Sequence, residues 1–509
     1  MIVDGTEAEQ ALDPAHRRGG LIALAPLIAL VATGCAAGPD FKKPAPPAIA
    51  AYVDHPLADA AATPGVTAGE AQHFVAGADI SGDWWTLFHS RPLNELIDQA
   101  LANNHDLKAA QAALLAAHET TLAQRGAYAP TVTAGVSANR QRTSGALAPT
   151  PSTNAVEYSL FTPQVSVSYV PDVFGLNRRT VEGLKAQEQA TRYQMVAAHL
   201  TLTSNVANAV IQYASLRTQV EATQELVAIN GKIVDTLKYQ VSKGYAGGLD
   251  LAAQQGQLAS AVATLPPLVK QLAQQRDAIA VLVGDFPSEA RIADFDLASL
   301  QLPTDLPLTL PSALVAQRPD VLQAQANLHA ASAQIGVAAA NRLPNIQLGA
   351  TAGTSGLALG QVFGPGSAFW TIGAEIAAPI FDGGALKHQQ GAARAAYVQA
   401  DEQYRSTVLT AVQNVADSLV AIEQDAEALK AAAAASDAAR VTLDLSQRQY
   451  KDGYAGYLSV LSAEQAWQQA RIALVQAQAS RLADTVALFQ ALGGGWWNRP
   501  DLARGAHAS

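Results

Sequence analysis

Few residues of this chain stand in a pattern that could do covalent chemistry. The ten histidines are scattered without the spacing of metal ligands, and no HExxH, paired CxxC, Walker or nucleophile-elbow motif occurs. Cys35 is the one cysteine among 509 residues, so an intrachain disulfide is excluded and the thiol needs another explanation. The sequence therefore predicts no enzyme, no metal site and no cofactor, and Cys35 becomes the candidate for modification.

Cys35 closes a targeting pattern. A basic segment ending at Arg18 precedes an apolar run from Leu21 to Val31, which is too short to span a bilayer as a helix. The letters ATGC at residues 32–35 then resemble a bacterial lipobox. The resemblance implies a lipoprotein signal peptide over residues 1–34, a palmitate-type lipid anchor on Cys35, and the outer rather than the inner membrane. The alternative is a cysteine that lies by chance near a signal peptidase site.

Two short motifs further along the chain are near copies of each other. KGYAGGLDL begins at Lys243 and DGYAGYLSV begins at Asp452, and each holds a glycine placed to end a helix. A second match pairs the segment from Asp106 with the segment from Asp320. Self-similarity on this scale predicts a tandem structural repeat, with each GYAG motif at the turn of a long helical hairpin.

Long helices must position these turns. The composition is 15% charged and 6% aromatic, and the segments 177–242 and 386–451 hold no proline. At 1.5 Å per residue each segment can form a helix of roughly 100 Å. In the second segment, apolar residues from Val408 to Leu429 recur at alternating four and three, as in a coiled-coil seam. The net charge of −10 leaves no basic patch, so no nucleic-acid partner is expected.

Four other segments alternate apolar and small polar residues, beginning near residues 131, 163, 345 and 368. Val167 and Ile372 fall on the apolar side of their segments, whereas Ser166 and Glu375 fall on the other. Such alternation is typical of transmembrane strands. The alternative is an ordinary antiparallel sheet with one buried face.

Four strands cannot close a membrane barrel, so their edges must pair between chains. Eight strands in a dimer would be filled by side chains, whereas twelve in a trimer leave a lumen. The expected fold is mainly α with a small transmembrane β part: long helical hairpins in a trimeric α-barrel, and four strands per chain in a 12-stranded β-barrel. The expected divisions begin with a signal peptide at 1–34 and an extended N-terminal periplasmic segment at 35–90. The first repeat covers 91–300, with a β-hairpin at about 131–170 and a tip turn at 243–250. The second repeat covers 301–495, with a β-hairpin at about 345–381 and a tip turn at 452–459, and a tail follows at 496–509.

Several linked motifs resemble one family. They are CAAGPDFKKP from Cys35, the segment from Leu310 that contains AQRPDVLQAQANLHAASAQIGVAAANRLPNIQLG, the GYAG turns and the C-terminal ALGGGWW. Together they resemble the outer membrane factor (TolC-like) family, in particular its NodT-type efflux lipoproteins, over essentially the whole mature chain. The resemblance implies a homotrimeric conduit that exports drugs or other small molecules across the periplasm and the outer membrane. It also implies a periplasmic adaptor, an inner-membrane transporter of the resistance-nodulation-division class, and outer-membrane lipid as partners.

The resemblance further implies that the two turns form the periplasmic end, where the adaptor docks. Ser459 and Ser462 stand where relatives often carry gate aspartates, although Asp250 and Glu464 lie nearby. Three alternatives remain at this point: a type I secretion channel, a metal-efflux channel, or a non-conducting periplasmic scaffold lipoprotein. For the turns, the alternative is that they only cap helices and pack the tip. The residues expected at the docking tips are Gly244, Tyr245, Gly247, Gly248, Leu249, Asp250, Gly453, Tyr454, Gly456, Tyr457, Leu458, Ser459 and Ser462.

Overall fold

The computed structural model of the chain describes residues 36–142 and 157–503. Cys35, on which the predicted lipidation falls, lies outside the described residues. None of the helices within these ranges combines the length and apolar character that a membrane-spanning helix needs. The elements are β1 (His73–Ala76), η2 (Trp84–Phe88), α3 (Arg91–Asn103), α4 (His105–Arg125), η3 (Gly126–Tyr128), β2 (Thr131–Arg142), β3 (Glu157–Tyr169), α5 (Leu176–Ser242), α6 (Gly248–Leu282), η5 (Leu297–Ser299), β4 (Asp305–Leu308), α7 (Pro311–Gln317), α8 (Pro319–Ala340), β5 (Asn345–Thr354), η6 (Leu359–Gln361), β6 (Ala368–Ala377), α9 (Ala385–Lys451), α10 (Tyr457–Ala491), η7 (Trp496–Asn498) and α11 (Pro500–Ala503).

The chain divides into two compact units. The first, here called the strand unit, comprises Met1–Lys42, His118–Gln187 and Asn327–Ala400. The second, here called the helical unit, comprises Lys43–Ala117, Glu188–Ala326 and Asp401–Ser509. Each unit draws on both halves of the sequence, and the strands β2, β3, β5 and β6 all lie in the strand unit.

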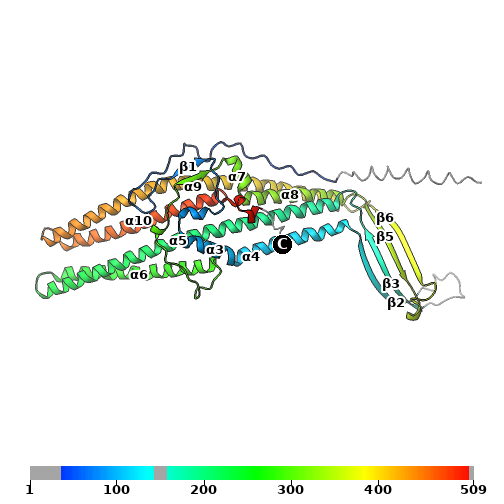
Figure 1. The fold of residues 1–509 in the computed structure, drawn as a ribbon, viewed down its shortest axis with the longest axis horizontal. Helices are drawn as coiled ribbons and strands as arrows, with labels where there is room; N and C mark the ends of the chain where they lie inside the picture. The colour runs from blue at the N-terminus through cyan, green and yellow to red at the C-terminus, as the bar shows by residue number, and fades with distance from the viewer. Residues whose placement is uncertain (1–35, 143–156, 504–509) are drawn as a thin grey trace, which may run out of the picture. The chain divides into compact units, whose positions relative to one another are not determined.

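The strand unit contains one antiparallel sheet in the order β2-β3-β5-β6 (Figure 1). All four segments with alternating polarity are strands, as predicted. The second strand begins at Glu157, six residues before the alternating pattern that starts at Pro163. The hairpin partners run in continuous register from Thr131↔Ser168 to Arg142↔Glu157, which extends the strand beyond the part visible in the sequence.

Two helical hairpins form most of the helical unit. The first joins α5 to α6 and the second joins α9 to α10, with their turns at the same end of the unit (Figure 1). The first helix of each hairpin has 67 residues and the second has 35. Of the predicted seam in α9, Val408, Val415, Leu419, Ile422, Ala426 and Leu429 are buried, which confirms that this face packs inward.

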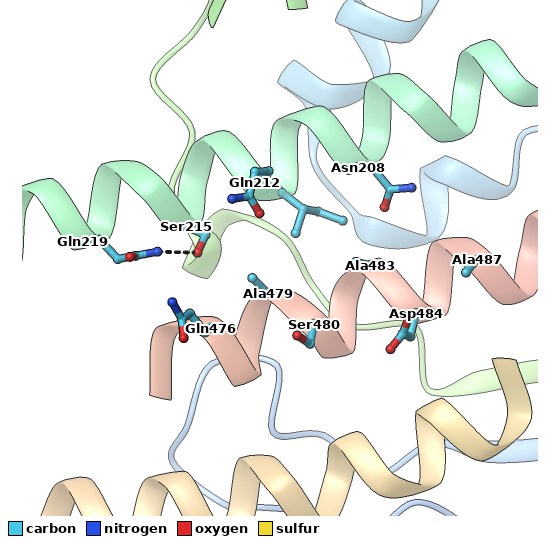
Figure 2. Close-up of a pocket in the computed structure, with 11 residues that line it drawn as sticks. Asn208, Gln212, Ser215, Gln219, Gln476, Ala479, Ser480, Ala483, Asp484 and Ala487 are labelled. Carbon is cyan, nitrogen blue, oxygen red and sulfur yellow. Dashed lines mark hydrogen bonds between the residues drawn. The ribbon is translucent and has the colours of Figure 1, made fainter. Parts of the chain in front are cut away.

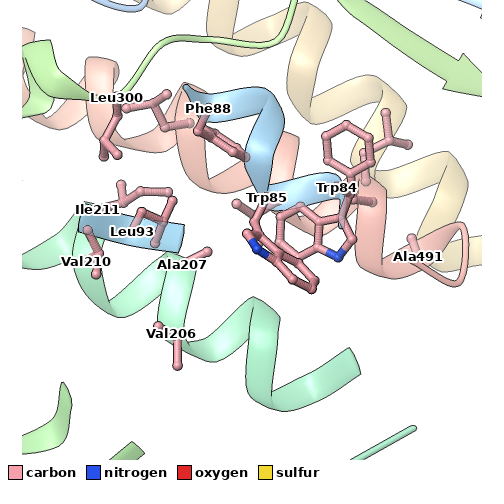
Figure 3. Packing of buried hydrophobic residues seen from close by; sticks show 14 of the residues in the cluster. Trp84, Trp85, Phe88, Leu93, Val206, Ala207, Val210, Ile211, Leu300 and Ala491 are labelled. Atoms are coloured by element: carbon pink, nitrogen blue, oxygen red, sulfur yellow. The ribbon is translucent and has the colours of Figure 1, made fainter. Parts of the chain in front are cut away.

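A shared apolar core holds the helical unit together. Trp84, Trp85 and Phe88 of η2 are buried in it (Figure 3). The ring of Trp84 stacks on that of Phe489 of α10, with centroids 5.4 Å apart. The tryptophan pair therefore packs against the helices of this unit. Helix α3 covers the same core with its apolar face, which consists of Leu93, Leu96, Ile97 and Ala100.

The segment that precedes this core is fastened at several points. Strand β1 pairs in parallel with β4 from the second half of the chain. Arg481 of α10 is fully buried, and its guanidinium donates hydrogen bonds to the carbonyl oxygens of Ala68 and Glu70, at 3.0 and 2.7 Å. A buried cation held by backbone carbonyls fixes this segment to the helices. The sequence predicts an extended segment here, and it gives no sign of these attachments.

Candidate functional site

The sheet of the strand unit separates apolar from polar side chains across all four strands. Val167 pairs with Val132 on one side and with Ala350 on the other, and Ala350 pairs with Ile372. In the same way, Ser166 pairs with Thr133 and Thr351. Residues paired across antiparallel strands lie on the same face. One face is therefore apolar and the other polar over the whole width of the sheet.

The polar face carries its own hydrogen bonds. The hydroxyls of Ser166 and Thr351 lie 3.2 Å apart, and the amide of Gln347 donates to the hydroxyl of Ser168 at 3.1 Å. These bonds link β3 to β5 while leaving the outer surface of the face polar. Such a surface suits contact with water.

The apolar face is uncovered within the described part of the chain. Trp370, Ile372 and Ile376 of β6 are 69–75% exposed, and Val132 and Val136 of β2 are exposed as well. Contiguous apolar surface of this kind marks contact with a membrane or with another protein. These exposed side chains of β6 lie at one edge of the sheet. A membrane or partner protein that covers the apolar face must therefore extend to that edge.

Both edges of the sheet are open in the described residues. Strand β2 pairs on one side with β3, and β6 pairs on one side with β5, so each leaves a row of backbone donors and acceptors without a partner strand. The edge strands have 12 and 10 residues. Exposed edges of that length are templates for pairing with another chain.

Both GYAG turns end their helices in the same way. The backbone N–H of Tyr245 donates to Gln240 and that of Gly244 to Val241, while Tyr454 and Gly453 repeat the pattern in the second hairpin. These bonds form Schellman motifs, which need a left-handed residue at the glycine. Gly244 has φ +77° and Gly453 has φ +78°, so the predicted capping role of both is confirmed.

Most residues predicted at the tips face outward. Tyr245, Leu249, Tyr454 and Leu458 are 72–86% exposed, and Ser462 is exposed too. Gly247 and Gly456 are the N-caps of α6 and α10, and Gly248 is the first residue of α6. Asp250 lies in the first turn of α6, and the hydroxyl of Ser459 donates to the carbonyl of Gly456 at 2.7 Å. The tips therefore expose aromatic and aliphatic side chains around well-capped turns.

Tyr457 lies apart from the other tip residues because it is 5% exposed. Its hydroxyl donates to Oε1 of Gln254 on α6 at 2.5 Å, and Nε2 of Gln254 donates to Oδ1 of Asn230 on α5 at 2.8 Å. This chain of bonds ties the second hairpin to both helices of the first. Gln254 and Asn230 were not found from the sequence, where amides are too common in these helices to stand out.

The buried carboxyl of Glu464 lies further along α10, beyond Tyr457. Glu464 is 2% exposed, and neither of its carboxyl oxygens has a hydrogen-bond partner among the described residues. Burial raises its pKa to about 7. A carboxyl in such a place favours the neutral form, because the ionised form would lose its hydration.

A polar cavity of about 670 Å³ lies between α5 and α10. Gln212, Ser215 and Gln219 of α5 line it together with Ser480 and Asp484 of α10 (Figure 2). Burial, together with a hydrogen bond and the charge from Asp484, raises the pKa of Asp425 to about 7. In residues 36–142 and 157–503, no group of three or more His, Cys, Asp or Glu side chains could hold a metal ion.

Comparison with known proteins places these features in one family. The family model described as "Outer membrane efflux protein" matches residues 96–285 and 310–494. The pyoverdine export outer membrane protein OpmQ of Pseudomonas aeruginosa is 30% identical over 85% of this chain and 92% of its own length. The probable efflux pump outer membrane protein TtgC of Pseudomonas putida is 29% identical over 94% and 96%.

Solved structures agree with the sequence matches. The open-state MtrE outer membrane channel of Neisseria gonorrhoeae superposes with a TM-score of 0.76 at 26% identity, over 91% of this chain and 98% of that one. The CmeC outer membrane channel of Campylobacter jejuni, at 22% identity and a TM-score of 0.81, shares the fold. The family model and these relatives together show that the chain belongs to the outer membrane efflux protein family.

Proposed function

We propose that three copies of this chain form the outer-membrane conduit of a tripartite efflux pump. The observation that carries the proposal is the sheet, which has one polar face, one uncovered apolar face and two open edges. The family assignment already makes the chain an outer-membrane efflux channel. The number of copies, the partners and the cargo are the parts proposed here.

Three copies are favoured by the size of the closed structure. Pairing β2 of one copy with β6 of the next keeps neighbouring strands antiparallel, because the order β2-β3-β5-β6 alternates in direction. Twelve strands would enclose a lumen, whereas eight would be filled by side chains. In this arrangement Ser166, Gln347 and Thr351 line the lumen, and Trp370 and Ile372 face lipid.

The lipid anchor is part of the proposal. Acylation of Cys35 would add to the membrane attachment that the strands give. Each buried methylene contributes about 0.8 kcal/mol of binding free energy, and several acyl chains together make a stable anchor. The supporting observation is the lipobox-like sequence that ends at Cys35.

The hairpin tips are proposed as the docking surface for a periplasmic adaptor, which in turn binds an inner-membrane transporter of the resistance-nodulation-division class. Exposed tyrosines, such as Tyr245 and Tyr454 at these turns, are among the residue types that most often anchor protein interfaces. The two tips differ: Gly248, Leu249 and Asp250 in one correspond to Tyr457, Leu458 and Ser459 in the other. An adaptor must therefore fit two kinds of tip.

The cargo is proposed to be small organic molecules. The relatives named above are described by pyoverdine export and by efflux pumps, and none of their names describes a metal or a protein substrate. A lumen lined by serine, threonine and glutamine offers weak polar contacts without a specific site. Selection would then belong to the inner-membrane transporter.

Conductance of the purified full-length protein in planar bilayers tests the channel. We expect discrete conductance steps, each of the size that one trimeric pore would give. The steps should be larger when the adaptor is added. Silence under all conditions, including with the adaptor, would argue for the scaffold alternative.

A matched pair of labelling variants separates the two alternatives further. Ile372 and Thr371 are neighbours on β6 that fall on opposite faces. In a channel, Thr371→Cys should react with a water-soluble maleimide while Ile372→Cys is protected in the bilayer. Equal, rapid labelling of both would show that the sheet is not embedded.

A further inference from the structure

The first described residues of the chain are held in a groove of the strand unit. The backbone N–H of Ala37 donates to the carbonyl of Phe174 at 3.0 Å, just before α5 begins. The guanidinium of Arg179 donates through Nε to the carbonyl of Ala37 at 3.1 Å and through Nη2 to Asp40 at 2.7 Å. Residues 36–41 are here called the N-terminal clamp.

Charged and aromatic contacts complete the clamp. The side chain of Arg179 is buried, and its Nη1 donates to Glu182 at 2.7 Å. The other oxygen of Glu182 lies 2.9 Å from Nε2 of His329 on α8. The ring of His329 stacks on Phe41 with centroids 4.3 Å apart. Two helices, α5 and α8, therefore grip the same short segment with charge-assisted bonds, which are the stronger kind.

Glycines make room for this close approach. A Cβ at Gly336 of α8 would lie 2.7 Å from Cγ of Arg179 and 2.8 Å from the carbonyl oxygen of Ala37. A Cβ at Gly175 would lie 2.7 Å from Cβ of Ala36, and Gly175 has φ +78°. Side chains at these two positions would push the segment out of the groove. A loose N-terminal tail would not need such a fit.

A cavity of about 130 Å³ adjoins the clamp. Its walls come from the β3–α5 connection, residues 170–176, and from the α8–β5 connection, residues 340–346. Val170, Val173, Leu343 and Ile346 supply apolar surface. Both oxygens of Asp172 in the wall accept hydrogen bonds from the first backbone N–H groups of α5, so this carboxylate is already engaged.

Cys35 directly precedes the first residue of the N-terminal clamp in the sequence. Phe174 lines the cavity and also accepts the hydrogen bond of Ala37, which lies two residues after Cys35. Two residues span at most about 7 Å. Any group carried on the thiol or the amino group of Cys35 thus starts within reach of the cavity mouth.

We infer that the N-terminal clamp seats the acylated Cys35 over this cavity, which takes up only the first few atoms of the lipid linkage. A volume of 130 Å³ corresponds to about four groups of water size, at ~30 Å³ each, so the rest of each acyl chain leaves toward the bilayer. The lining suits this ligand because apolar walls meet methylenes while Asn341 and Asn345 can donate to ester or amide carbonyls. The inference rests on the lipid anchor proposed above.

Photo-crosslinking of the full-length protein tests the seat. A benzophenone amino acid at position 343, in the cavity wall, should crosslink to the acylated Cys35 peptide, identified by mass spectrometry after proteolysis. The same amino acid at position 359 is the control, because Leu359 is exposed in the strand unit and does not line the cavity. Equal yields at both positions, or crosslinks from 343 only to free lipid or to a second copy of the chain, would overturn the inference.

Two glycine variants test the clamp itself. Gly336→Ala should lower the crosslink yield at 343 at least fivefold and expose residues 36–41 to protease. Gly391→Ala is the matched control, since Gly391 is also helical and a Cβ there meets nothing within 4 Å. Undiminished crosslinking in Gly336→Ala would refute the clamp.

Acyl labelling separates this inference from the proposed function. If Cys35 takes up labelled palmitate and no crosslink forms at 343, the seat is wrong and the lipid anchor stands. If Cys35 takes up no label, the anchor and the seat both fail, while bilayer conductance still decides whether the chain is a channel.

Discussion

At the scale of single residues, the buried carboxyl of Glu464 is expected to make the stability of the fold depend on pH. Its pKa of about 7 in the folded protein lies above the ordinary value of 4.5. The folded state therefore holds a proton that the unfolded state has released, and stability falls as pH rises from 4.5 through 7. Below 4.5 the neutral carboxyl carries no such penalty.

Glu464→Gln should remove this dependence. We expect the variant to match the wild type at pH 5 and to exceed it at pH 8 by roughly 1–2 kcal/mol, since one pKa unit is about 1.4 kcal/mol and water reaching the site reduces the full effect. Thermal unfolding in detergent from pH 5 to 8 measures it. Glu402→Gln, an exposed change on α9, should keep the wild-type slope. A residual slope from Asp425 is expected in both variants, and an unchanged slope in Glu464→Gln would contradict the assignment.

The roles of some of these residues could be predicted from the sequence and those of others could not, for a physical reason. Gly244 and Gly453 are visible because a left-handed helix end has a strong glycine preference. Tyr457 is visible as part of a motif, yet its burial depends on Gln254, which is 203 positions away. Arg179 and Arg481 are equally hidden, since a buried guanidinium and a solvated one look the same in a sequence.

At the scale of elements, the hairpin turns combine one strained and one relaxed glycine. Gly453 has φ +78°, whereas Gly456, three residues later, has φ −75°. A Cβ at either position meets nothing within 4 Å, so only the backbone conformation distinguishes them. Comparing the same substitution at both sites therefore measures the cost of the left-handed backbone conformation that the turn requires.

Gly453→Ser should destabilise the tip by about 1–2 kcal/mol, the usual cost of a left-handed conformation for a residue with a Cβ. Gly456→Ser should be neutral, because serine is a good N-cap residue. We expect weaker adaptor crosslinking at the tips and reduced dye efflux from cells with Gly453→Ser only. Full efflux in that variant would argue against docking at this turn.

Elements with regular local patterns were predicted well, and those set by distant contacts were not. The α9 seam and all four sheet strands follow from periodicity alone. Helix α6, however, continues through Pro266 and Pro267, where a proline pair in a sequence normally argues for a break. Strand β1 exists because it pairs with β4, 232 positions away at His73↔Asp305, and four residues carry no periodicity of their own.

At the scale of the whole molecule, the open edges of the sheet are the main support for the proposed assembly. An antiparallel sheet with an uncovered apolar face and two free edges is incomplete as a single chain, because both the backbone groups and the apolar side chains need partners. A ring of copies joined edge to edge satisfies both needs at once. In the proposed ring, β2 of one copy pairs with β6 of the next.

Cysteine pairs test this join in membranes. Val136→Cys on β2, combined in turn with a single cysteine at each position from 368 to 377 on β6, should give disulfide-linked dimers and trimers on denaturing gels, and no larger species. Facing residues of neighbouring strands lie close enough for a disulfide, with Cα atoms about 4.5–5.5 Å apart. Only those β6 positions that face Val136 should react, and they should share one face of the strand.

The control uses a pair whose register is known within one chain. Val165 on β3 and Ala352 on β5 are direct partners, so cysteines there should form an intrachain bond and leave the chain monomeric on the gel. A ladder that stopped at dimers would indicate eight strands, too few to enclose a lumen, and would refute the trimeric conduit. A ladder continuing past trimers would mean that the edges do not close into a ring of three. Only a stop at three, with reactive positions on one face of β6, fits a water-filled passage lined by the polar face of the sheet.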